Sequence, residues 1–195
     1  AWQIRLVFWL GALLVGLTAA IFAILASQAD HNFMLLANQY PWLPFVLTPA
    51  GLMLISWLTR RFFPGASGSG IPQTIAALSM KHKSSVLSFR IAAGKLLLTV
   101  MGLFCGASIG REGPTVHIGA SIMYSLRRFA HFPAFYYQHG LIAAGGAAGV
   151  AAAFNTPLAG IVFALEEISR SFEQRTNGII LTAVIFAGMT AMALQ

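Results

Sequence analysis

The sequence predicts an all-α polytopic membrane protein, a bundle of transmembrane helices in which some helices are tilted, discontinuous or re-entrant. Three observations predict this fold class. Of the 195 residues, 57% are hydrophobic and only 9% are charged, whereas a soluble domain carries roughly a quarter charged residues. Several apolar runs approach the ~20 residues that a spanning helix needs. Alternation with a period of two is absent, which argues against membrane strands.

The charge balance is basic, with 12 Lys and Arg against 5 Asp and Glu. These cations lie between apolar runs, where they mark the cytoplasmic side of a membrane, so we expect a lipid bilayer and no nucleic acid as partner. The single cysteine, Cys105, offers neither a disulfide nor a metal site, and no cofactor is expected. Because the chain begins at Ala1 and ends inside an apolar run, we expect a piece of a longer protein.

The first part of the chain reads as two simple spans. Residues 6–25 form an uncharged run, residues 30–38 a polar connection, and residues 40–58 a second span that Arg60 and Arg61 terminate. Basic residues next to span ends favour the cytoplasmic side. We therefore expect residues 30–38 to lie outside.

The pattern then changes to shorter pieces. A Gly/Ser-rich segment opens a helix at residues 73–80, a basic linker follows, and residues 91–109 form a third long run. The remaining apolar pieces are residues 115–126, 141–154, 157–165 and 178–194. Half-length segments separated by Gly and Pro are typical of discontinuous helices around a binding site in mid-membrane.

The first break is Gly68-Ser69-Gly70-Ile71-Pro72. Pro in the first turn after Ser and Gly predicts a helix start, and unpaired N–H groups with a partial positive charge attract anions there. The alternative is an ordinary helix cap on a surface loop. A phosphate loop is excluded because no Gly-Lys-Ser/Thr follows.

The second break, Gly110-Arg111-Glu112-Gly113-Pro114, contains one of only five acidic residues. A carboxylate after a membrane-length apolar run is costly unless it faces water or a partner. At a helix start, Glu112 can occupy the position of a mobile anion and leave it when protonated. The alternative is a capping glutamate paired with Arg111. The third break, residues 153–160, leads into a short helix that ends at Glu166 and Glu167. One of these carboxylates is placed to pair with Arg170, at i+3 from Glu167 or i+4 from Glu166, and the alternative for each is a solvated helix end.

Together, these three strings resemble the CLC family of chloride channels and chloride/proton antiporters. The resemblance covers nearly the whole chain and implies that residues 1–195 are the N-terminal half of a CLC-type transmembrane domain, with the second half absent. It implies chloride/proton exchange with a glutamate gate, or else a passive voltage- or pH-gated chloride channel. It also implies a homodimer in the plasma membrane, the inner membrane in a Gram-negative bacterium, with chloride and protons as the transported ligands and no enzymatic activity.

Carried over by position, the resemblance makes the first two strings the chloride filter. Ser69 resembles the serine that coordinates the central chloride, Glu112 the external gate, and Glu167 the internal glutamate that loads protons. Gln73 departs from the acid that some relatives carry there. Lys95 matches a basic position, where it either raises the local potential for anions or snorkels to the interface.

Two rival interpretations remain. Gly65-Ala66-Ser67-Gly68 resembles the nucleophile turn of intramembrane serine proteases, which need a histidine on a neighbouring span as general base. His131 and His139 instead lie in a connector rich in Phe, Tyr and Pro, and this interpretation leaves Glu112 without a function. An unrelated anion transporter with broken helices is the third possibility. We expect His117 to be a packed polar residue.

Overall fold

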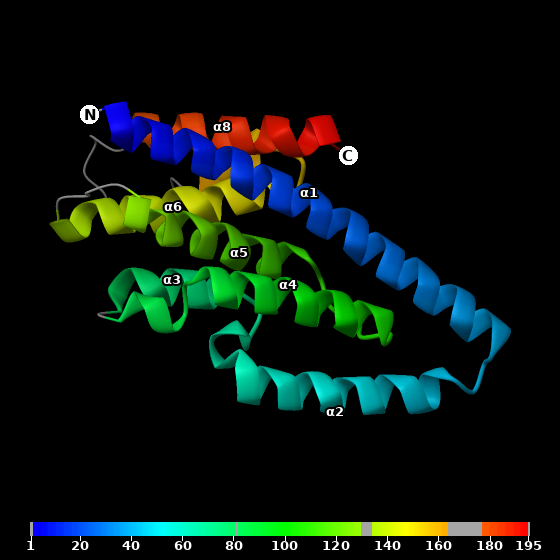
Figure 1. The fold of residues 1–195 in the computed structure, drawn as a ribbon. Helices are drawn as coiled ribbons and strands as arrows, with labels where there is room; N and C mark the ends of the chain where they lie inside the picture. The colour runs from blue at the N-terminus through cyan, green and yellow to red at the C-terminus, as the bar shows by residue number, and fades with distance from the viewer. Residues whose placement is uncertain (1, 81, 130–133, 164–176, 195) are drawn as a thin grey trace.

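The computed structural model describes residues 2–80, 82–129, 134–163 and 177–194 (Figure 1). Every regular element within these residues is helical, which confirms the all-α prediction. The α-helices are α1 (Trp2–Gln39), α2 (Pro44–Phe62), α3 (Ile71–Ser79), α4 (Phe89–Phe104), α5 (Glu112–Ser125), α6 (Ala134–Ala153), α7 (Pro157–Phe163) and α8 (Asn177–Leu194). Short 3-10 turns lie at Pro64–Ala66, Lys83–Ser85 and Leu126–Phe129.

Helix α1 corrects the prediction of a polar connection at residues 30–38, because it continues without interruption to Gln39. No Gly or Pro occurs between Gly16 and Pro41, and polar residues alone do not end a helix that is otherwise rich in Ala and Leu. Its 38 residues extend about 57 Å at 1.5 Å per residue, well beyond a hydrocarbon core of ~30 Å. Figure 1 shows α1 running obliquely past the other helices.

Two helical stretches of the described residues are long and apolar enough to cross a membrane, Leu6–Gln39 and Lys83–Phe104. Helix α2 lies at one edge of the bundle (Figure 1) and packs mainly on α4. Thr48 Oγ1 donates to the Cys105 carbonyl at 2.7 Å across this contact. The other face of α2 exposes large apolar side chains, among them Phe45 (83%) and Met53 (73%), as a surface against lipid or further protein would.

Helix α4 ends at Phe104, five residues before the predicted end at residue 109. The cause is Gly106, which has a φ of +80° and packs against the Phe33 ring of α1. A side chain at residue 106 would collide with that ring, so the left-handed turn depends on glycine. The chain then runs irregularly to α5, which begins at Glu112 rather than at residue 115.

The centre of the bundle is α5, in which every residue from Pro114 to Ser125 is buried. It packs against α6 at a very short distance, because a Cβ on either Gly119 or Gly145 would lie 2.4 Å from the carbonyl oxygen of the other. Small residues permit such backbone contact between membrane helices. The position of the α5 start is therefore set by the core of the protein.

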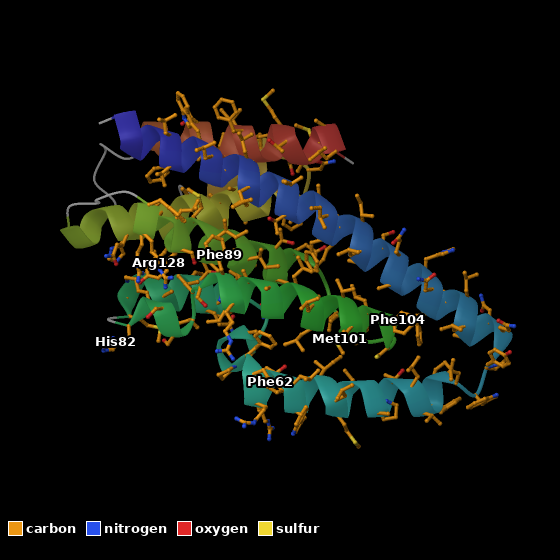
Figure 2. All side chains as sticks on the ribbon, in the orientation of Figure 1. Phe62, His82, Phe89, Met101, Phe104 and Arg128 are labelled. Atoms are coloured by element: carbon orange, nitrogen blue, oxygen red, sulfur yellow. The ribbon has the colours of Figure 1, made fainter. Side chains whose placement is uncertain are left out.

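The basic helix ends gather on one side of the molecule. Figure 2 shows His82, Phe89 at the start of α4, and Arg128 near the end of α5 at one end of the bundle, toward which α2 runs to finish at Phe62. Arg60 and Arg61 lie in that last turn of α2, where cations also suit the helix dipole. This arrangement agrees with a cytoplasmic side rich in Lys and Arg.

Candidate functional site

The site is built around residues 66–70, which we call the filter loop. Gly68 and Gly70 have φ values of +82° and +126°, conformations that other residues rarely adopt. Gly70 is the residue that caps the start of α3, and Pro72 lies in its first turn. The loop thus presents the start of a nine-residue helix, where the first N–H groups have no partner within the helix.

Side chains of α3 hold the filter loop from one side. The Gly70 N–H donates to Gln73 Oε1 at 2.7 Å, and Gln73 Nε2 donates to the Ser67 carbonyl at 3.0 Å. Thr74 Oγ1 donates to the Gly70 carbonyl at 2.9 Å. These bonds restrain the loop on both sides of Ser69.

Lys95 of α4 holds the loop from the other side. Its side chain is buried, and its ammonium group donates to the Ala66 carbonyl at 2.8 Å and to the Gly68 carbonyl. Lys95 therefore does not snorkel to the membrane interface, and that alternative is wrong. The sequence could not show this, because the direction in which Lys95 points depends on how α4 packs.

The second break forms the start of α5. Glu112 is the first residue of the helix, and its carboxylate lies against Gly110, since a Cβ at residue 110 would be 2.4 Å from Glu112 Oε2. Arg111 extends to α1, where its guanidinium lies 3.5 Å from the Ala23 carbonyl oxygen. Among the described residues, no ion pair joins Arg111 to Glu112. The alternative in which Glu112 pairs with Arg111 is therefore not the arrangement in the structure.

The two helix starts meet backbone on backbone. A Cβ at Gly70 would lie 2.1 Å from the Gly113 carbonyl oxygen, and a Cβ at Gly113 would lie 2.7 Å from the Ser69 carbonyl oxygen. Such distances exclude any side chain at either position. The first two predicted breaks, which are about forty residues apart in the chain, are thus brought into direct contact.

A cavity of about 650 Å³ lies at this meeting point. Its lining includes Ser67, Gly68, Ser69 and Ile71 from the first break, and Gly110, Gly113 and Pro114 from the second. Within the part of the chain that the structure describes, the charged residues that line it are Lys95 and Arg60. Gly70, Pro72, Arg111 and Glu112 lie beside the cavity without lining it. Sequence reasoning assigned Arg60 only to membrane topology, although its place just before the filter loop was a signal for the site.

The third break does not reach this cavity. Asn155 adopts a positive φ of 55°, and Pro157 at the start of α7 packs against Gly188 of α8. Glu166, Glu167 and Arg170 lie outside the described residues. Glu167 is the residue to which the resemblance assigns proton loading. The structure therefore unites two of the three predicted breaks.

The histidines give little support to a serine protease. His139 Nε2 lies on the Leu78 carbonyl oxygen, near the end of α3 remote from Ser67, and His131 is outside the described residues. His117 is fully buried with Nε2 at 2.9 Å from the Val86 carbonyl oxygen, as expected for a packed polar residue.

Comparison with known proteins gives a consistent result. A family model described as voltage gated chloride channel matches residues 51–195. The H(+)/Cl(-) exchange transporters ClcA of Salmonella arizonae and Salmonella newport are each 36% identical over 169 residues, which is 83% of this chain and 34% of theirs. The crystal structure of a slow cyanobacterial Cl-/H+ antiporter superposes with a TM-score of 0.84 at 28% identity, over 99% of this chain and 47% of that one. The chain thus spans about a third of the length of these curated relatives.

Replacing Lys95 by Met should loosen the filter loop, because the Ala66 and Gly68 carbonyls would lose their buried donor. Leaving such groups unpaired costs about 1–3 kcal/mol. Hydrogen exchange by mass spectrometry should show faster exchange in peptides that cover residues 65–70. Arg128→Met, at an exposed basic residue, is the control and should leave those peptides unchanged. Equal exchange in both variants would contradict the role of Lys95 in holding the loop.

Proposed function

This chain belongs to the voltage gated chloride channel family, and from that premise we propose that it forms part of a transmembrane chloride pathway whose complete protein exchanges chloride for protons. One observation carries the proposal. The starts of α3 and α5 meet at glycine residues beside a cavity that is lined by the cations Lys95 and Arg60. The relatives described above are transporters of this kind by name. The protein is an integral membrane protein.

The cavity has the chemistry that an anion requires. The starts of α3 and α5 contribute partial positive charge and N–H groups without helical partners. Lys95 and Arg60 add positive charges, while no carboxylate is among the described residues that line the cavity. We assign chloride coordination to the hydroxyl of Ser69 and to the backbone around it.

Glu112 has the position of a gate. As the first residue of α5 it lies at the positive end of the helix dipole, beside Gly110, which lines the cavity. An ionised Glu112 and a chloride ion would therefore compete for the same positive region. Protonation removes the charge of Glu112 and relieves the competition, which links proton movement to chloride movement.

We further propose that Glu167 loads protons from the cytoplasmic side, as the resemblance implies. A passive chloride channel of the same family would share the filter and differ only in the absence of proton coupling. We also propose that residues 1–195 act as the N-terminal half of a transmembrane domain, that a second half completes the cavity, and that two copies form a homodimer in the plasma membrane, which is the inner membrane in a Gram-negative bacterium.

Glu112→Ala in the complete protein should abolish proton coupling and still pass chloride, because the competing carboxylate is gone. The measurement is simultaneous recording of chloride and pH in liposome suspensions. Asp30→Ala, which removes an exposed carboxylate on α1, is the control and should keep the coupling of the wild type. A Glu112→Ala protein that still drives protons against their gradient would refute the gate assignment.

Glu167→Gln should stop proton movement while chloride flux continues, since the proposed entry point for protons is no longer titratable. The same liposome recordings measure both ions. Glu166→Gln changes the neighbouring carboxylate and should keep proton movement. If protons still move in Glu167→Gln, the proton route begins elsewhere.

Ser69→Ala should weaken chloride binding about five-fold, which corresponds to the loss of one neutral hydrogen bond of ~1 kcal/mol. Isothermal titration calorimetry of the purified complete protein gives the affinity. Ser85→Ala removes a serine hydroxyl that is bonded to the His82 carbonyl in the turn before α4, and should bind chloride like the wild type. An unchanged affinity in Ser69→Ala would remove Ser69 from the chloride site.

A further inference from the structure

Gln73 has no role in the pathway described above, yet its amide joins both ends of the segment that carries Ser69. Oε1 accepts from the Gly70 N–H at 2.7 Å, and Nε2 donates to the Ser67 carbonyl at 3.0 Å. One planar group therefore fixes both end residues, Ser67 and Gly70, of the segment that carries Ser69. Both halves of the amide are used, one as acceptor and the other as donor.

The fit between this amide and the loop is close. A Cβ at Gly68 would lie 1.7 Å from Gln73 Nε2, so the amide rests directly against the Gly68 backbone. Lys95 takes the Ala66 and Gly68 carbonyls, and Thr74 takes the Gly70 carbonyl. With the Gln73 bond to Ser67, the carbonyls of residues 66, 67, 68 and 70 each have a side-chain donor.

We propose that Gln73 is a positioning residue for the chloride site: it holds Ser69 in place, and it does so only because its side chain donates and accepts at the same time. The proposal rests on the proposed function. A carboxylate at residue 73 could accept from Gly70 but could not donate to Ser67, because an ionised carboxylate has no proton to give. A protonated carboxylic acid has one O–H donor and one carbonyl acceptor, and so can replace both amide bonds.

This requirement gives a test that depends on pH. Gln73→Glu should lose the Ser67 bond when the new side chain is ionised and regain it when that side chain is protonated. Gln73→Met has a similar length and forms neither bond at any pH. Among the described residues, the other charged or titratable groups around the loop are Lys95 of α4, Arg60 of α2, and Glu112 and His117 of α5. Lys95, Arg60 and His117 are present in every variant, and Glu112 is replaced by Gln in all of them, so each variant is compared with its parent at the same pH.

The measurement is chloride binding by isothermal titration calorimetry on the purified complete protein. All variants carry Glu112→Gln, which removes competition from the gate. At about pH 7.5, where a glutamate of ordinary pKa is ionised, Gln73→Glu should bind chloride about five-fold more weakly than the parent or worse. At about pH 4, near the ordinary glutamate pKa, it should recover to within about two-fold. Gln73→Met should be weakened about five-fold at both pH values.

Each outcome decides the proposal. If both variants bind chloride like a chloride-binding parent, Gln73 does not position the site, and the proposed function stands without it. A Gln73→Glu defect that is equal at both pH values also overturns the proposal, because it would come from a change other than donor loss. A parent that binds no chloride overturns the proposed function and the inference together.

Should Gln73→Met fail to fold, hydrogen exchange of residues 66–70 in Gln73→Glu carries the test. After correction for intrinsic exchange rates, exchange at about pH 7.5 must be faster in Gln73→Glu than in the parent. At about pH 4 the two proteins must exchange at the same rate.

Discussion

The backbone contact between Gly70 and Gly113 is the constraint on which the rest of the structure depends. Both residues are glycines, and a Cβ at either one would collide with the backbone of the other segment. Because neither has a Cβ, the starts of α3 and α5 can come together with their partial positive charges beside one cavity. The remaining structure holds them there. Helix α5 is buried along nearly its whole length, and the filter loop before α3 is bonded by Lys95, Gln73 and Thr74.

The buried ammonium group shows how the fold keeps charge in an apolar environment. Moving a lysine out of water is costly unless its donors find partners. Lys95 satisfies two donors with the Ala66 and Gly68 carbonyls, so the same contacts stabilise the loop and retain a positive charge at the cavity. Arg60 adds a second cation from α2. The site thus combines dipoles and full charges of one sign, and Glu112 stands beside them as the group of opposite sign.

The fold class and the first two breaks were predictable, because Gly and Pro strings mark helix starts regardless of tertiary context. The predictions failed where packing decides. The polarity of residues 30–38 predicts a connection, but a helix ends at a helix-breaking residue, and the first one after Gly16 is Pro41. The end of α4 depends on the contact between Gly106 and Phe33. The inward direction of Lys95 and the place of Arg60 depend on how α4 and α2 face the loop, which hydropathy does not encode.

The most direct test of the account is the location of a bound halide. Crystals of the complete protein grown with bromide would give anomalous scattering that marks each bound ion. We expect a bromide peak in the cavity between Ser69 and Gly113, within reach of the α3 and α5 starts. A cavity without bromide, in crystals that bind the ion elsewhere along the protein, would contradict the claim that these two helix starts form the anion site.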